Sequence, residues 1–392
     1  MVKRVDFLIF DAFGIGGTVR AVLESANSLA QAGFDVQIVS VFQSALDPKF
    51  SLDPSIQIRV LAPRRATKDS TRWNLNLRER VQIRKASKEL HAQDPARKHF
   101  SRLSDAKIRD YLRESEARIV VSTRLSLNLL TARWHNRAIR PILQEHTYFG
   151  AHDSATQLEI TRAYSQGCTV VTVTQEDCLN YQSALGDSAK VIAIGNALPE
   201  IEFIPSELRS KNVLSVARLS NEKGVDLLID AAKLVVPEFP DWHFWVAGAG
   251  PEYTVLQKQI FDLGLHNNVH LIGQVNDIAG LYSQASIYVQ PSRFEGFGIA
   301  IIEAMASRLP VIAFDCPVGP RSIIEDGVDG LLVPEQDIES LARKLRELMS
   351  NSKLREEIAN SAVSGVSKFS KVHIDELLVE LIRSELAELE LV

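Results

Sequence analysis

The sequence has 392 residues, more than one hydrophobic core usually serves, so we expect two domains. Hydrophobic residues make up 45% of it, charged residues 24%, and the net charge is −5, a composition typical of globular proteins. No apolar run approaches the roughly 18 residues that would span a bilayer. The three scattered cysteines form no C-x-x-C pair, which favours a reducing cytoplasm.

The chain begins with MVKRVDFLIFDAFG, which we interpret as a first strand and not as a signal peptide, because Asp6 and Asp11 interrupt its apolar run. A glycine loop follows, and then a predicted helix that ends at Gly33. The apolar residues of that helix fall on one stripe: Val19, Val22, Leu23, Ala26, Leu29 and Ala30.

Short β-branched runs then alternate with amphipathic helices, which indicates parallel sheets of the α/β class. Further strands are predicted at 36–41, 118–123, 141–146, 168–173, 189–194, 212–218, 242–248, 268–273, 286–292, 310–315 and 330–334. We therefore predict two Rossmann-like, doubly wound domains that face a central cleft, at 1–195 and 212–371, with a linker at 196–211. The amphipathic helix at about 372–392 is expected to pack back on the first domain.

Positive charge is concentrated in residues 61–113, which hold 15 Lys and Arg against 6 Asp and Glu, a balance of +9. This pattern fits a solvated helical face, but also a surface that contacts the inner face of a membrane peripherally or grips a polyanionic acceptor. Nucleic acid is not an expected partner, because aromatic residues are sparse there. The apolar residues interleaved with the charges are Leu75, Leu77, Val81, Ile83 and Leu90.

Several predicted strand-to-helix turns carry residues that suit an anionic ligand. GIGGTVRAV places Gly16 and Gly17 where backbone amides can approach an anion. VARLSNEKGVDLLI places Arg218 and Lys223 just after a strand, where two cations suit a diphosphate. VAGAGPE repeats the glycine turn at Gly250. The alternative for the glycine loop is an ordinary tight turn, and the alternative for Arg218 and Lys223 is two surface charges.

The stretch SRFEGFGIAIIEAMASRLP combines two acids with a glycine-rich loop. The strand before it and the helix after it make residues 295–298 the connecting loop, which begins with Glu295 and whose free amides can meet sugar hydroxyls and a phosphate. Glu303 falls within two turns of the helix start, among apolar neighbours, where a carboxylate can accept hydrogen bonds from a ribose diol. The alternative for Glu303 is an ordinary acid on a helix surface.

Taken in chain order, six stretches resemble glycosyltransferase family 4 (glycosyl transferases group 1), retaining enzymes of the GT-B fold. They are GIGGTVRAV, QEHTYFG, VARLSNEKGVDLLI, GAGPE, FEGFGIAIIEAMA and DCPVGPRSIIEDGVDGLLV, which span residues 1 to about 335. The R-x4-K pattern followed by E-x7-E is the specific part of the resemblance. Ser322 departs from the family pattern, because many members carry glutamate there.

The resemblance implies a nucleotide diphosphosugar donor, with a UDP-sugar favoured by DCPVGP, held mainly by the C-terminal domain. It implies that Arg218 and Lys223 bind the diphosphate, that Glu303 binds the ribose, and that Glu295 lies at the donor sugar. His146 in QEHTYFG corresponds to the active-site histidine and completes the catalytic set with Arg218, Lys223 and Glu295. The other donor-binding residues implied are Gly16, Gly17, Gly250, Gly296, Phe297, Gly298 and Ile299.

The reaction implied is transfer of a hexose or N-acetylhexosamine, with retained configuration, in cell-surface polysaccharide biosynthesis. The acceptors implied are a glycan, a polyol-phosphate polymer, a lipid-linked molecule or a protein. No cofactor is expected, and metal-independence is predicted because the chain contains no D-x-D motif. Two other hypotheses stay open: a GT-B nucleotide-sugar epimerase, and an inactive sugar-binding or assembly subunit.

Overall fold

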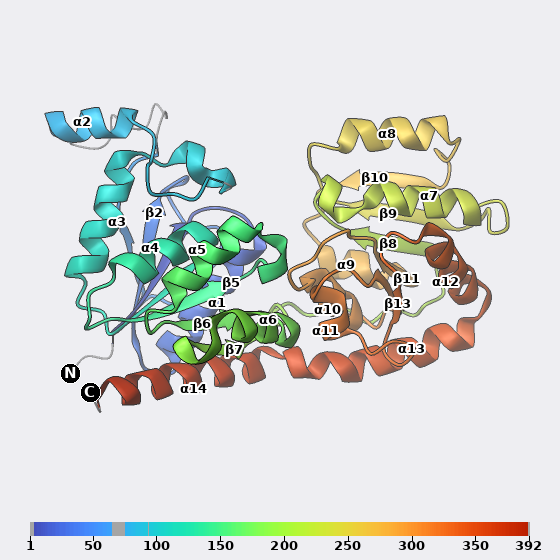
Figure 1. Cartoon of the computed structure of the whole chain (residues 1–392). Coiled ribbons are helices and arrows are strands. Elements are labelled where there is room, and N and C mark those ends of the chain that lie inside the picture. The colour runs from blue at the N-terminus through green and yellow to red at the C-terminus, as the bar shows by residue number, and fades with distance from the viewer. Residues whose placement is uncertain (1–3, 65–74, 93, 391–392) are drawn as a thin grey trace. The chain divides into compact units, whose positions relative to one another are not determined.

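The computed structural model describes residues 4–64, 75–92 and 94–390. The chain divides into two compact units, Met1–Gly195 with Ile374–Val392, and Asn196–His373. Each unit is an α/β domain built on one parallel sheet, as the alternating pattern predicted (Figure 1). Among the described helices, none combines the length and the hydropathy needed to cross a membrane.

The first unit is built on a seven-stranded sheet in the order β3-β2-β1-β4-β5-β6-β7, and every strand pair is parallel. The order reverses between β1 and β4, the point where ligands of such sheets usually bind. Strand β3 escaped prediction because it is a short edge strand with no buried residue. The strands are β1 Arg4–Asp11, β2 Asp35–Phe42, β3 Gln57–Val60, β4 Ile119–Thr123, β5 Arg140–Glu145, β6 Thr169–Thr172 and β7 Lys190–Ala193.

Helices cover both faces of this sheet. On one face α1 (Gly17–Gln31) packs beside α14 (Lys371–Glu390), the last helix of the chain. Four apolar residues of α14 enter the core with α1, and Lys190 Nζ holds the buried Glu385 carboxylate at 3.0 Å. The C-terminal helix therefore packs on the first unit. The opposite face is covered by α3 Arg102–Glu114, α4 Leu125–Trp134, α5 Ser154–Tyr164 and α6 Gln175–Leu185.

The basic segment forms α2 (Leu77–Arg84), a short 3₁₀ turn (Pro95–His99) and most of α3, while its residues 65–74 and 93 lie outside the described ranges. Its apolar residues do not share one surface. Leu75 and Ile83 are buried against α3, whereas the side chains of Leu77 and Val81 are 85% and 50% exposed. Only part of the predicted apolar stripe therefore faces solvent, because α3 already covers the rest.

The second unit is built on a six-stranded parallel sheet in the order β10-β9-β8-β11-β12-β13. Helices α7, α8 and α12 cover one face, and the ring contact between Tyr282 and Tyr288 places α9 on the other. The strands are β8 Asn212–Val216, β9 His243–Ala247, β10 Val269–Gly273, β11 Ile287–Gln290, β12 Val311–Phe314 and β13 Leu331–Val333. The helices are α7 Val225–Val235, α8 Tyr253–Asp262, α9 Ile278–Ser283, α10 Ile299–Ala306, α11 Gly319–Ile323, α12 Ile338–Ser350 and α13 Ser352–Gly365.

Residues 196–211, which the sequence marks as a linker, are part of the second unit. The buried Ser206 donates its hydroxyl to the carbonyl of Ala285 at 2.5 Å, and its amide bonds to the carbonyl of Ser307 at 2.8 Å. Leu208 is 4% exposed. This segment is therefore an ordered part of the second unit, because its backbone and hydroxyl groups form hydrogen bonds with that unit.

Candidate functional site

Two predicted site residues of the second unit meet at the carboxyl edge of its sheet. Lys223, after β8, places its Nζ 2.7 Å from Oε1 of Glu295, after β11, although 72 positions separate them. The same oxygen accepts hydrogen bonds from Gln290 Nε2 at 2.6 Å and Ser292 Oγ at 2.8 Å. Glu295 is only 7% exposed, and three donors offset the cost of burying its carboxylate.

Close backbone approaches hold these loops together, and glycine permits them. A β carbon at Gly224 would lie 1.9 Å from the carbonyl oxygen of Pro291, in the loop after β11. A β carbon at Gly250 would lie 2.1 Å from the carbonyl oxygen of Leu219, in the loop after β8. Gly250, predicted as a donor-binding residue, therefore also has a packing reason to be glycine. The loops that carry Lys223 and Glu295 are packed without space for a methyl group.

We expect Gly224→Ala to destabilise the second unit by about 2–4 kcal/mol, the sum of a steric clash and a left-handed backbone at a residue with a β carbon. Its φ is +61°, and the matched control Gly264 has φ +70° but no atom within 4 Å of the place that a β carbon would take. Gly264→Ala should therefore cost only about 1 kcal/mol. Chemical denaturation measures both variants, and equal losses would show that the contact with Pro291 is unimportant.

Residues 296–299 lead from Glu295 into α10. Gly298 adopts φ +108° before the helix and accepts the Ile301 amide through its carbonyl at 2.9 Å. Phe297 is buried, with its ring edge-on to Phe369 at a centroid distance of 5.4 Å. The amides of Ile299 and Ala300, which start α10, have no partner inside the helix and are suited to bind an anion.

Glu303 lies in α10 and is half-buried. The Tyr282 hydroxyl donates to its Oε2 at 2.9 Å, and burial, with Glu303 alongside, raises the pKa of Tyr282 well above 10. Arg218 follows β8 on the loop that also carries Lys223, and its side chain is exposed. Its guanidinium donates no hydrogen bond within the described part of the chain, so its donors are available to a ligand.

His146 of the first unit directly follows β5. Burial of its ring lowers the pKa to about 4, so the imidazole is neutral at pH 7. Its Nε2 is enclosed and has no hydrogen-bond partner among the described residues. A neutral, half-buried histidine at a strand end can donate or accept one hydrogen bond from a bound molecule.

Two buried acids hold the chain on either side of His146, and the sequence hints at them only through Glu145 at the end of β5. Glu145 accepts hydrogen bonds from Asn128 Nδ2 at 2.9 Å and from the Tyr164 hydroxyl. Burial raises the pKa of Glu145 to about 7 and that of Asp177, whose carboxylate accepts the Phe149 amide, to about 6. These hydrogen bonds fix both ends of the short segment that contains His146.

Gly16 and Gly17 lie at the switch point of the first sheet, after β1. Gly16 precedes α1, and its carbonyl accepts the Arg20 amide at 3.0 Å. Both glycines are exposed, and no side chain caps α1 within the described residues. Helix α1 therefore starts at the carboxyl end of β1 with its first amides uncapped by a side chain among the described residues, and anion binding there stays a prediction.

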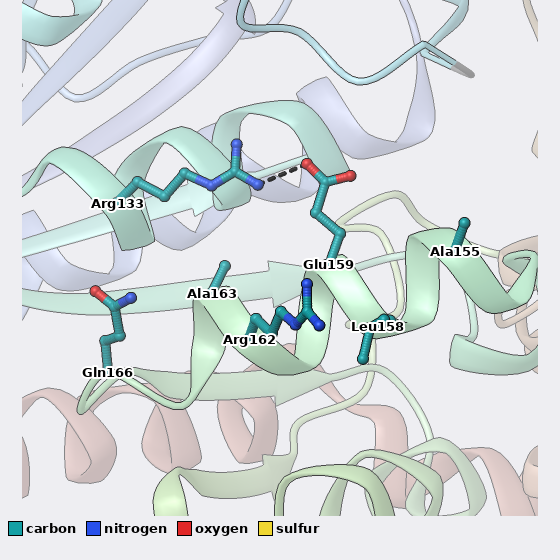
Figure 2. Close-up of a pocket in the computed structure, with 7 residues that line it drawn as sticks. All are labelled: Arg133, Ala155, Leu158, Glu159, Arg162, Ala163 and Gln166. Atoms are coloured by element: carbon teal, nitrogen blue, oxygen red, sulfur yellow. Dashed lines mark hydrogen bonds and ion pairs between the residues drawn. The ribbon is translucent and has the colours of Figure 1, made fainter.

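A shallow hollow of about 270 Å³ lies elsewhere on the first unit, between α4 and α5 (Figure 2). Arg133 reaches across it to Glu159 at 2.6 Å. None of the predicted site residues lines it, and it lies on helices rather than at strand ends. Its lining residues are Arg133, Ala155, Leu158, Glu159, Arg162, Ala163 and Gln166.

Comparison with known proteins identifies the family. Residues 199–364 match the family model described as glycosyl transferases group 1. The chain is also 30% identical to the exopolysaccharide phosphotransferase SCO2592 of Streptomyces coelicolor, over 97% of this chain and 41% of the relative. It belongs to the group 1 glycosyltransferases. The family match covers Arg218, Lys223, Glu295 and Glu303.

Two further comparisons bear on this glycosyltransferase. It is 31% identical to the poly(ribitol-phosphate) alpha-N-acetylglucosaminyltransferase of Staphylococcus aureus, over 50% of this chain and 40% of the relative. Its fold matches a mutant of S. aureus TarM, solved with fondaparinux, alpha-GlcNAc-glycerol and UDP, with a TM-score of 0.73 and 18% identity over 97% and 99% of the two chains. The GT-B fold prediction is thereby confirmed. The chain spans less than half the length of both curated relatives named here.

Proposed function

We propose that this glycosyltransferase transfers a hexose or N-acetylhexosamine from a UDP-sugar, with retained anomeric configuration, to a glycan, polyol-phosphate polymer, lipid-linked or protein acceptor. The observation that carries the proposal is the Lys223–Glu295 ion pair at the carboxyl edge of the second sheet, with Glu303 eight positions further on. The S. aureus relative named for transfer to poly(ribitol-phosphate), and TarM solved with UDP, support the acceptor and donor classes.

The proposed barrier lies in oxocarbenium character at the donor sugar and in negative charge on the leaving diphosphate. Arg218, Lys223 and the first amides of α10 would stabilise that negative charge, an electrostatic effect that is often the largest in catalysis. Glu295 would orient the sugar and stabilise its positive charge, while Glu303 would bind the ribose. The acceptor hydroxyl would attack on the face the diphosphate leaves, and the leaving phosphate oxygen would take its proton. His146 would hydrogen-bond a sugar hydroxyl as a neutral imidazole.

Product analysis of the purified protein with several UDP- and GDP-sugars tests this function. A glycosyltransferase releases free UDP, slowly by hydrolysis and faster with a suitable acceptor. An epimerase would instead isomerise the donor, and an inactive binding subunit would bind it without turnover. A thermal-shift screen of the same donors identifies the nucleotide and sugar, because a ligand that binds the native state raises the apparent stability.

We expect excess EDTA to leave turnover nearly unchanged. The chain has no D-x-D motif to hold a divalent ion beside the diphosphate, and Arg218 and Lys223 are proposed to supply the positive charge there. UDP release measured with EDTA, and with added Mg²⁺ or Mn²⁺, decides the point. Complete loss in EDTA that either metal restores would contradict metal-independence.

We also propose that α2 docks the protein peripherally on an anionic membrane, such as the inner face of the cell membrane. The exposed Leu77 and Val81 lie among the exposed Arg80, Arg84 and Lys85. Each basic residue near such a surface contributes about 1 kcal/mol, so changing these three to Gln should weaken binding to anionic liposomes by on the order of 10²-fold. Co-sedimentation at two salt concentrations measures liposome binding. Equal binding to neutral and anionic liposomes would exclude docking on an anionic membrane.

A further inference from the structure

Cations gather around one aromatic ring at the carboxyl edge of the first sheet. Phe10 is the penultimate residue of β1, Arg64 follows β3, and Arg124 follows β4. Because β1 to β4 run parallel, the three residues reach the same edge, next to the β1–β4 switch point. The Cζ atoms of Arg64 and Arg124 lie 5.6 Å and 5.0 Å from the centre of the Phe10 ring.

His99 and Lys98, from the 3₁₀ turn before α3, complete this group, which we call the Phe10 cluster (Phe10, Arg64, Lys98, His99 and Arg124). The His99 ring lies 6.0 Å from the Phe10 ring. Burial lowers the pKa of His99, and the positive charges of Arg64, Lys98 and Arg124 lower it further. Besides burial, three cations thus lie close enough to His99 to disfavour its protonated form.

In the described part of the chain, two acids form ion pairs with the arginines of the cluster. Asp11 pairs with Arg64, and Asp94 lies 3.9 Å from Arg124. Their side chains are 3% and 5% exposed, against 25% and 37% for the two arginines. Both carboxylates also accept backbone amides, at 3.0 Å for Asp11 and 2.8 Å for Asp94. Asp11 and Asp94 are therefore more deeply buried than the two arginine side chains that they pair with.

The backbone conformation of Arg124 gives a separate reason to expect a role for its guanidinium. Arg124 adopts φ +83° as the residue before α4, a conformation that favours glycine and is strained for arginine. A glycine would fit this turn without strain, and it would remove the guanidinium. The strained turn directs a guanidinium over Phe10 at the start of a helix whose first amides add positive potential.

We propose that the Phe10 cluster binds a phosphodiester group of a polyol-phosphate acceptor. This inference deepens the proposed function and rests on it for the role of the bound polymer as an acceptor. The Arg124 guanidinium, which donates no hydrogen bond among the described residues, presents paired N–H donors that match two phosphate oxygens. Arg64 adds positive charge beside it, and the neutral His99 can donate one more hydrogen bond. The cluster thereby selects a phosphate-linked polymer over a neutral glycan.

The test measures binding of a fluorescent glycerol-phosphate hexamer to the full chain by anisotropy. We expect Arg124→Gly and Arg64→Gln each to raise Kd about tenfold or more, the loss expected for one charged hydrogen-bonding partner. Arg64→Lys, which retains the charge beside Asp11, should raise Kd by less than Arg64→Gln does. Arg162→Gln, which removes an exposed arginine from α5, should bind like the wild type. Inorganic phosphate should compete with the hexamer, and neutral maltohexaose should not.

The outcomes separate this inference from the proposed function. If UDP binding and sugar transfer are absent but hexamer binding still depends on Arg64 and Arg124, the function fails and the anion site stands. If sugar transfer occurs but Arg124→Gly, whose glycine suits the turn, binds the hexamer like the wild type, the anion site is wrong. Variants that lose binding to anionic vesicles but keep binding to the hexamer would also overturn it, because the cluster would then recognise lipid headgroups.

Discussion

Replacing Lys223 with alanine is expected to lower kcat by on the order of 10²-fold or more, as the loss of a charge stabiliser at a leaving group does. The Lys223 ammonium lies 2.7 Å from Glu295 Oε1 and is the only cation that pairs with that carboxylate in the described part of the chain. Without it, the leaving diphosphate would lose a positive charge. The Glu295 carboxylate would also keep only the neutral donors Gln290 and Ser292.

The matched control for this variant is Lys233→Ala, which removes an exposed lysine from α7, the helix that follows the Lys223 loop. Steady-state kinetics with a UDP-sugar and a thermal melt on both variants separate catalysis from folding. A large loss in kcat at an unchanged Tm supports the assigned role. Wild-type kcat/KM for Lys223→Ala would remove this residue from the site.

The sheets were predictable because a buried parallel strand carries its own signal. Runs such as VDFLIF and PVIAFD are mostly apolar on both faces and are followed by or end in an acid, as is typical of a central strand between two helical layers. Strand β3 carries no such signal, since all four of its side chains remain at least partly exposed. Residues 196–211 have the sequence of a linker because their contacts are made by single groups, namely the Ser206 hydroxyl, backbone groups and the Leu208 side chain, which leave no periodic pattern.

Parts of the candidate site were predictable for a different reason. The E-x7-E spacing places Glu295 in a loop and Glu303 in the helix that follows it, so one stretch of sequence carries both positions. The partners Gln290 and Ser292 were missed, because their function depends on how the β11 loop folds back on itself. The hydrogen bonds of Glu145 beside His146 were missed as well, since Glu145 and Tyr164 meet only through the packing of α5 on β5.

The charge pattern of the basic segment did not predict which of its residues lie together in the fold. Its charge balance predicted a cationic surface, but not which residues would gather on it. Arg64 and Arg124 are 60 positions apart and belong to different segments of the chain, and the parallel order of β3, β1 and β4 brings them to one ring. A count of charges along the chain cannot reveal such a cluster, because it depends on the order of strands in the sheet.

Glu295→Gln is expected to lower kcat by on the order of 10²–10³-fold while leaving the affinity for UDP nearly unchanged. Glutamine keeps the size of the side chain and an oxygen for the donors Gln290 and Ser292, so the loop should keep its shape. What it loses is the negative charge proposed to stabilise the oxocarbenium-like sugar, an effect present only in the transition state. Single-turnover rates and UDP titration measure the two quantities separately.

Glu303→Gln in the same motif is the matched comparison for that variant. If Glu303 binds the ribose, its loss weakens binding of the UDP group equally in the ground state and the transition state. KM should therefore rise by about tenfold while kcat changes little. The two variants should therefore give opposite signatures, although both remove one carboxylate and lie eight positions apart. The opposite result, a lower kcat for Glu303→Gln and a higher KM for Glu295→Gln, would reverse the assigned roles. The carboxylate that stabilises the oxocarbenium-like sugar would then be the one on α10 and not the one in the loop.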